Sequence, residues 1–284
     1  MRIARVFPRR TKATPSDELA FVGAPGLFPP EVDEVHVSVT FTWDLPEAER
    51  LAREWRHVAP VRIGGPATGM RGEEFIPGRY LKSGYVITSR GCPNRCWFCS
   101  VPEREGRIVR EYPVADGFNI LDDNLLACSD SHVREVFSML SRQQTRAEFT
   151  GGLEAAILKD WHVDLLAQLK PHQLFFAYDT PGDWDPLVIA AAKMIEADFT
   201  RQNLRCFVLI GYENDTIERA EKRLESVLNL GVFPMAMLFR DKNGKRDRQW
   251  MRFQKKWARP AAIYAAHNNK CNDNSHKVFD IQGM

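Results

Sequence analysis

The sequence predicts an α/β protein, built as a partial (β/α)6 TIM-like barrel with a small N-terminal α/β unit. The first observation is a rhythm of apolar, strand-like segments after Gly84, which recur at intervals of roughly 30 residues, the length of one strand and its crossover helix. The second is a strand, helix and strand pattern that precedes this rhythm. Together they divide the chain into residues 1–76, residues 77–265 and a polar tail of residues 266–284.

The N-terminal unit contains a stretch rich in β-branched residues, which predicts a buried strand at residues 34–42. Residues 45–57 follow with helical spacing, and Pro46 lies near the first turn, where its missing N–H costs nothing. A second strand is expected at residues 58–63, just before two glycines and a proline. Strand, helix and strand form one βαβ unit, so the predicted sheet is parallel.

Six further strands are predicted in the second part of the chain. Amphipathic stretches between them predict helices, including one with Ser129 or Ser131 as its N-cap and one with Asn214 or Asp215 as its N-cap. Parallel strands joined by such helices bring their C-terminal ends to one side, where barrels carry their active sites. The strands are expected to start near residues 85, 117, 147, 173, 206 and 233.

The composition is that of an ordinary folded protein. Hydrophobic residues make up 44% and charged residues 27% of the 284 positions, and the net charge is +2. These values allow a core of normal size and give no electrostatic reason to expect a nucleic acid or a membrane as a partner. No apolar run approaches the roughly 18 residues of a membrane span, and the basic start lacks the apolar segment of a secretory signal. We therefore expect a cytoplasmic location.

Three of the six cysteines lie within eight positions, at Cys92, Cys96 and Cys99. Clustered cysteines in a cytosolic protein indicate a metal or catalysis rather than disulfides, and thiolates select zinc or iron–sulfur clusters. A structural zinc normally has four protein ligands, and no fourth cysteine or histidine lies nearby in the loop. Three thiolates can instead hold three corners of a four-iron cube and leave the fourth iron open to another ligand.

The CxxxCxxC spacing, with Gly91 before the first cysteine and Phe98 before the last, resembles the motif of the radical S-adenosylmethionine (SAM) superfamily. The resemblance covers roughly residues 33–260. It implies a partial (β/α) barrel, a [4Fe–4S] cluster on the three cysteines and SAM on the open iron. It also implies reductive cleavage of SAM to a 5′-deoxyadenosyl radical, which abstracts hydrogen from a substrate that the sequence does not identify. An electron donor such as flavodoxin or ferredoxin is then an expected partner.

The same resemblance suggests which other residues hold SAM. The usual Gly-Gly-Glu is absent, so the acidic pair in the Asp-Asp-Asn stretch at residues 122–124 would serve in its place. Each suggestion has a second interpretation: the acidic pair could cap the next helix, residues 151–152 could turn the chain, and Glu154 could be a first-turn residue favoured by the helix dipole. The expected cofactor contacts are Phe98, Asp122, Asp123, Glu154, Asp179 and Gly211.

The N-terminal unit resembles a shortened form of the cobalamin-binding domain that precedes many radical SAM barrels. The cobalt-ligating Asp-x-His-x-x-Gly motif is missing, because Asp33 and His36 have the wrong spacing and no glycine follows them correctly. We therefore expect no bound cobalamin. His36 is predicted to be a strand residue with a satisfied ring, and the unit to cover one side of the barrel or to contact substrate.

A basic stretch at residues 242–259 leaves two interpretations open. Trp250, Phe253 and Trp257 lie in it at helical spacing, so they either pack onto the barrel or stack on nucleic-acid bases. The second interpretation makes RNA a possible substrate. It also supports the alternative to an enzyme, which is a zinc-stabilised nucleic-acid-binding protein without catalysis.

The other three cysteines form no local motif. Cys206 is expected in the core because it opens an apolar strand, and Cys128 is expected near the site because it follows the second strand of the rhythm. Cys271 lies in the polar tail.

Overall fold

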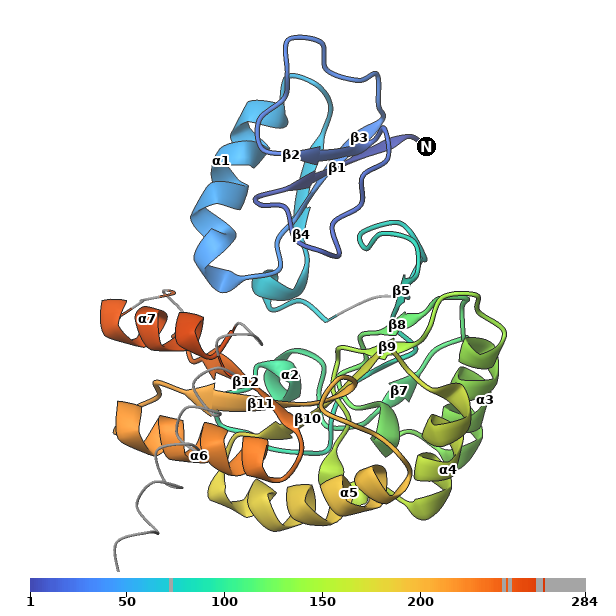
Figure 1. Ribbon diagram of the computed structural model, residues 1–284. Coiled ribbons are helices and arrows are strands. Elements are labelled where there is room, and N and C mark those ends of the chain that lie inside the picture. The colour runs from blue at the N-terminus through green and yellow to red at the C-terminus, as the bar shows by residue number, and fades with distance from the viewer. Residues whose placement is uncertain (72–73, 242–243, 245–246, 259–262, 264–284) are drawn as a thin grey trace, which may run out of the picture.

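The computed structural model describes residues 1–71, 74–241, 244, 247–258 and 263. The prediction of an α/β protein is confirmed, because the chain forms two parallel sheets with helices and one short antiparallel pair. Two separate hydrophobic clusters accompany the two large sheets. Figure 1 shows the N-terminal unit above the larger unit that carries the second sheet. The predicted tail at residues 266–284, with Cys271, lies outside the described residues.

The N-terminal unit is a four-stranded parallel sheet in the order β2-β1-β3-β4. Its predicted strand, helix and strand are present, although the first strand ends at Ser38 rather than at residue 42, because the chain turns there into a 3-10 helix. Two further strands were not predicted. The elements are β1 (Ile3–Phe7), β2 (Ala20–Val22), β3 (Glu34–Ser38), η1 (Thr42–Asp44), α1 (Leu45–Trp55), β4 (Val61–Gly64) and η2 (Pro66–Thr68).

The larger sheet has six parallel strands in the order β12-β11-β10-β9-β8-β5. Each strand therefore pairs with its neighbour in this series, and all six begin within two residues of a predicted start. The two ends of the series, β5 and β12, are not paired with each other. The strands are β5 (Tyr85–Val86), β8 (Asn119–Ile120), β9 (Glu148–Phe149), β10 (Gln173–Tyr178), β11 (Leu204–Ile210) and β12 (Phe233–Leu238).

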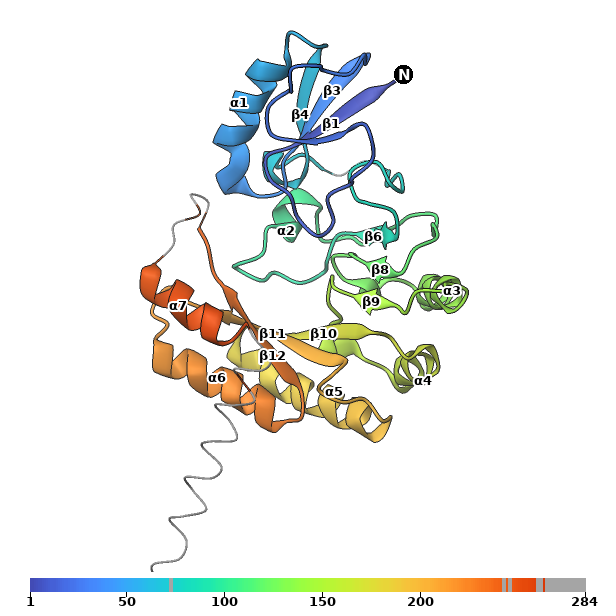
Figure 2. The ribbon, with the colours of Figure 1, turned by 45° about the horizontal axis from the view of Figure 1, so that its top comes forward.

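Helices follow the strands, and most of them pack on the side of this sheet away from the N-terminal unit (Figures 1 and 2). The last helix lies instead beside the edge strand β12. The predicted N-cap Ser129 accepts a hydrogen bond from the His132 N–H, whereas the cap before the later helix is Thr216. None of the helices among the described residues is long and apolar enough to cross a membrane. The helices are α3 (Asp130–Ser141), α4 (Asp160–Leu169), α5 (Trp184–Glu196), α6 (Ile217–Asn229) and α7 (Arg248–Lys256), with 3-10 turns η3 (Leu125–Ala127), η4 (Ala155–Ile157) and η5 (Pro181–Asp183).

The chain between β5 and β8 forms a hairpin that carries the three clustered cysteines. Its two short strands are β6 (Ser89–Arg90) and β7 (Arg110–Glu111), which pair antiparallel. Residues 91–109 between them, called the cysteine loop below, include the single-turn helix α2 (Val101–Arg104). The cysteine loop therefore follows the C-terminal end of β5 and precedes β8.

The N-terminal unit contacts the larger unit through its connecting segment and through Trp43. The Arg5 guanidinium donates to the carbonyl of Arg79 at 3.0 Å, and both ring nitrogens of His36 have partners, in Tyr80 and Glu34. The expectation of a satisfied His36 ring is thus confirmed. Trp43 lies under the Arg240 guanidinium, which is 4.8 Å from its ring centroid.

Candidate metal centre

The three clustered thiols are free and partly exposed. The Cys99 N–H donates to the Cys96 carbonyl at 3.1 Å, which forms a tight turn between them, and the Val101 N–H lies 3.5 Å from the Cys99 sulfur. The Cys92 N–H donates to the Gly106 carbonyl, so the two ends of the cysteine loop are joined. These hydrogen bonds fix the backbone of the loop that carries the three sulfur atoms.

The electrostatics of the loop oppose thiolate formation when no cation is present. Burial, with the added effect of the Cys99 and Cys92 thiolates, raises the pKa of Cys96 to about 11. Burial likewise raises the pKa of Cys99. A positive centre among the sulfur atoms would reverse this effect, since a nearby opposite charge favours the ionised form. A metal bound here would therefore have to be accompanied by ionisation of the thiols.

The three sulfur atoms are not gathered tightly around a single point. Among the described residues, one set of three possible ligands has all its ligand atoms within 4.8 Å of one another, and that set is Asp122, Cys128 and His132. The cysteine loop does not form such a set. Two of its thiols are nevertheless close enough to Cys96 to raise the pKa of that thiol.

Asp122, the first residue of the Asp-Asp-Asn stretch, anchors the start of the hairpin. Its carboxylate accepts hydrogen bonds from the Thr88 N–H, the Thr88 hydroxyl and the Ser89 hydroxyl, at 2.6, 2.6 and 2.7 Å. Burial raises the pKa of Asp122, and these hydrogen bonds oppose the rise. Asp122 is 2% exposed, and these hydrogen bonds use both of its carboxylate oxygen atoms.

Asp123, the second residue, anchors the chain just before the first cysteine. One of its oxygens accepts from Arg90 at 3.0 Å and lies 3.8 Å from Arg104, while the other accepts from the Gly91 N–H at 2.9 Å. Arg104 comes after the last cysteine, so a single carboxylate contacts both arms of the loop. Neither acidic residue caps a helix, because Ser129 caps α3.

Asn124, the third residue, connects Cys92 to Glu154. Its amide nitrogen donates to the Glu154 carboxylate at 2.5 Å and lies 3.5 Å from the Cys92 sulfur. Its amide oxygen is buried and has no hydrogen-bond partner. A buried acceptor without a partner is rare and marks a place where a ligand donor can bind. The structure therefore brings Glu154 and Asp123 to the cysteine loop and adds Asn124 between them.

Gly151 and Gly152 permit the close approach of β9 to this stretch. A Cβ on Gly151 would lie 2.5 Å from the backbone oxygen of Asp122, and Gly152 has a φ of +91°. The interpretation of these glycines as a turn agrees with the geometry, and it also explains how Glu154 reaches Asn124.

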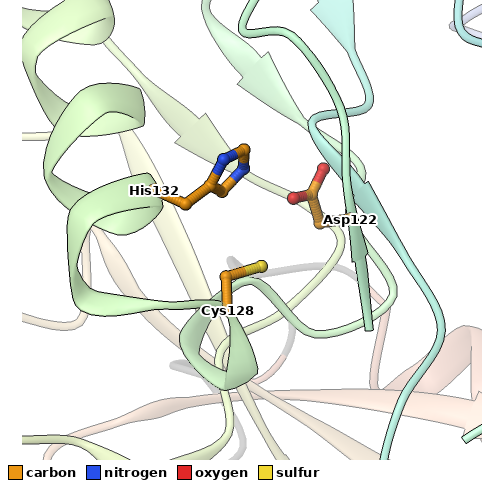
Figure 3. Close-up of side chains that lie close together, drawn as sticks. All are labelled: Asp122, Cys128 and His132. Atoms are coloured by element: carbon orange, nitrogen blue, oxygen red, sulfur yellow. The ribbon is translucent and has the colours of Figure 1, made fainter. Parts of the chain in front are cut away.

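Figure 3 shows the side chains of Asp122, Cys128 and His132 gathered together. Asp, Cys and His are a zinc-type donor set. However, the Thr88 hydroxyl donates its only proton to Asp122, so the His132 Nε2 atom, 3.1 Å away, must donate to that hydroxyl. Burial raises the pKa of the Cys128 thiol to about 12. The three groups are thus engaged in a hydrogen-bonded network with Thr88 and Ser89, which explains why they lie so close together.

An aromatic cluster links the cysteine loop to the far end of the sheet. Trp97 lies between the second and third cysteines. Its ring packs edge-on against Tyr212, with 5.6 Å between ring centroids, and at a tilt against Phe239, with 5.5 Å between centroids. Tyr212 follows β11 and Phe239 follows β12. Phe98 packs edge-on against Trp97 at 5.4 Å. Trp97 remains 59% exposed, so its ring also forms part of the surface beside the thiols.

Asp179, at the end of β10, accepts a hydrogen bond from the Leu209 N–H at 3.1 Å. Burial, and next the neighbouring Asp183, raises the pKa of Asp179 to about 7. Both carboxyls act on Cys96 by raising the pKa of its thiol. Asp179 is therefore near the second cysteine, and Asp183, which the sequence did not single out, accompanies it.

Gly211 lies at the end of β11 in the left-handed conformation, with a φ of +72°. A Cβ there would lie 2.6 Å from the Leu238 side chain and 3.0 Å from the Trp250 ring.

In the basic stretch, Phe253 and Trp257 are buried and Trp250 packs against the core. Packing therefore explains these three aromatic residues. Cys206 is fully buried in β11, as expected of a core residue.

Comparison with known proteins gave no relative: no family model matches the chain, and no curated protein is significantly similar to it.

Proposed function

We propose that this chain is a radical SAM enzyme whose [4Fe–4S] cluster is held by Cys92, Cys96 and Cys99. The observation that carries the proposal is the arrangement of three free thiols on one anchored loop at the C-terminal end of a parallel strand. Tetrahedral zinc with bonds of about 2.3 Å would place its sulfur ligands about 3.8 Å apart. The wider set of sulfur atoms here suits a cube, in which each thiolate binds a different iron.

We further propose that the six strands form the curved sheet of a partial (β/α) barrel. A flat six-stranded sheet would separate its edge strands by about 24 Å. Trp97 belongs to the loop after the first strand, yet it packs against residues that follow the fifth and sixth strands. This contact supports a curved sheet, whose strand ends surround a common site.

The residues around the thiols fit SAM as well as the cluster. The unpartnered Asn124 oxygen and the Glu154 carboxylate are acceptors beside Cys92, which suits an ammonium group. When bound, the cluster and SAM supply reductive cleavage to a 5′-deoxyadenosyl radical that abstracts hydrogen from a substrate. The chain's part is to orient and shield: Asn124 and Glu154 hold the amino end, Asp179 offers a carboxyl to hydroxyl groups, and Trp97 with Phe98 excludes water.

The chemistry also indicates the partners. An electron donor such as flavodoxin or ferredoxin would reduce the cluster, and a reducing compartment such as the cytoplasm would preserve it. RNA remains a proposed substrate only. The aromatic residues of α7 do not support it, because they pack into the core.

Anaerobic reconstitution with iron and sulfide tests the proposal. We expect about four irons and four sulfides per chain, and 5′-deoxyadenosine after addition of dithionite and SAM, measured by chromatography. The matched control is a chain in which Cys92, Cys96 and Cys99 are all replaced by alanine, which should bind no cluster. One zinc per chain with no sulfide would instead favour the zinc-stabilised binding protein.

A further inference from the structure

Asn124 is the side chain that contacts both a thiol and a carboxylate of the proposed site. Its amide nitrogen is 3.5 Å from the Cys92 sulfur and 2.5 Å from a Glu154 oxygen, so each of its two hydrogens has a partner. The side chain is 4% exposed. Water therefore does not compete for these contacts.

The orientation of the amide follows from its neighbours. A carboxylate oxygen can only accept a hydrogen bond, so the atom that faces Glu154 must be the nitrogen. The amide oxygen then points elsewhere, and it is the buried atom without a partner. One end of the amide thus serves the thiol, and the other end is open to a donor from a ligand.

We propose that Asn124 is a positioning residue that sets the reduction potential of the cluster through Cys92, and that it transmits ligand binding to that thiolate. The inference rests on the proposed function. A hydrogen bond to a cluster sulfur stabilises the more negative, reduced state and so raises the potential. A donor bound to the amide oxygen polarises the amide and strengthens its N–H···S contact, because linked hydrogen bonds reinforce one another. SAM binding would therefore make the cluster easier to reduce.

A matched control lies on β8, the strand that precedes Asn124. Asn119 is 1% exposed and donates from its amide nitrogen to the Glu148 carboxylate at 2.9 Å. It resembles Asn124 in burial and in having a glutamate partner, but its oxygen accepts from Thr150 and none of its hydrogen bonds reaches a sulfur. Asn124→Leu and Asn119→Leu thus remove equivalent amides, of which one contacts a thiol.

The experiment is a redox titration of the reconstituted full chain, followed by electron paramagnetic resonance, with and without SAM. For Asn124→Leu we expect reduction to be about tenfold less favourable, which is about 59 mV for one electron, and a smaller shift on addition of SAM. Asn119→Leu should keep the parent potential and the parent shift. If Asn124→Leu does not fold, Asn124→Ser replaces it, since the shorter side chain carries no amide donor.

Two results would overturn the inference while leaving the proposed function intact. One is a parent-like potential in Asn124→Leu with a full iron content, and the other is an equal shift in both asparagine variants. Failure of the proposed function is distinct, because the parent chain itself would then lack iron and sulfide before any variant is compared. That outcome would overturn both.

Discussion

The Asp123 carboxylate accepts a 2.9 Å hydrogen bond from the backbone N–H of Gly91, the residue before the first cysteine. This bond is one of a consecutive series. Asp122 binds Thr88 and Ser89, Asp123 binds the next two residues, and Asn124 contacts Cys92. Three adjacent side chains after β8 therefore hold five adjacent residues, 88–92, which end at the first cysteine of the loop.

Replacing Asp123 should loosen this anchor. Asp123→Ala removes the carboxylate that pairs with Arg90 and accepts from the Gly91 N–H, and breaking a largely buried pair in this way costs about 3 kcal/mol of unfolding free energy. Urea denaturation measures the loss, and iron content after reconstitution measures the effect on the loop. Asp130→Ala is the control, because its pair with Lys159 is exposed and should contribute at most about 1 kcal/mol. Equal losses in the two variants would contradict the anchoring role.

Replacing one thiol of the loop should remove the metal and preserve the fold. Cys96→Ala is expected to lose the iron–sulfur absorption band and SAM cleavage, because two thiolates cannot hold the cube. Its far-ultraviolet circular dichroism should be unchanged. Cys206→Ala is the control: the residue is buried in β11, so its loss should lower stability by about 1 kcal/mol and keep the iron. A normal absorption band in Cys96→Ala would refute the ligand assignment.

Asp179 should give the metal-free protein a pH-dependent stability. Its pKa is about 7 in the folded chain and about 3.9 when unfolded, so between these values the folded state holds a proton that the unfolded state lacks. Its contribution to stability therefore falls as the pH rises through this window, by at most about 1.4 kcal/mol per pH unit, and levels off above pH 7. Asp179→Asn should be more stable than the parent at pH 8 by a larger margin than at pH 5. Urea denaturation at both pH values tests this, and a margin independent of pH would show that the carboxyl does not titrate as described.

Gly91→Ala should distort the cysteine loop at its first turn. Gly91 has a φ of +97°, and an added Cβ would lie 2.4 Å from the Ile108 carbonyl oxygen. We expect a loss of about 2–4 kcal/mol in unfolding free energy and poor iron retention. Gly106→Ala shares the positive φ but has nothing within 4 Å of the added atom, so it isolates the backbone strain. Similar behaviour of the two variants would mean that the contact with Ile108 relaxes freely.

The sequence predicted the larger sheet because its strands recur regularly and several are long apolar runs. The strands β10, β11 and β12 have six or seven residues, which makes their apolar runs recognisable. The strands β1 and β2 were missed, since β1 contains an arginine that is buried only because its guanidinium binds Asp17 and two backbone carbonyls. The β6–β7 hairpin was also missed, because both of its strands consist of polar residues. Such strands owe their stability to tertiary contacts rather than to local pattern.

The sequence predicted the three thiols of the candidate site, but it did not predict the different contacts that the neighbouring residues make. Asp122 and Asp123 were expected as equivalent cofactor contacts, whereas the structure gives each a different part of the loop to hold. Successive side chains diverge once a strand ends, and their partners come from a segment about 30 residues earlier. A hydroxyl pair at Thr88 and Ser89, directly before the Arg-Gly-Cys sequence, was the available signal for these contacts.

The anchoring of residues 88–92 by residues 122–124 also bears on how the protein is made. At synthesis rates of 5–20 residues per second, Asn124 is added about 2–6 s after Cys92. Until then the side chains that anchor residues 88–92 have not all been synthesised. The loop can take its final form only after β8 has joined β5, because the holding side chains follow β8 directly. A cofactor bound by this loop, as proposed above, would therefore be inserted only after β8 has paired with β5.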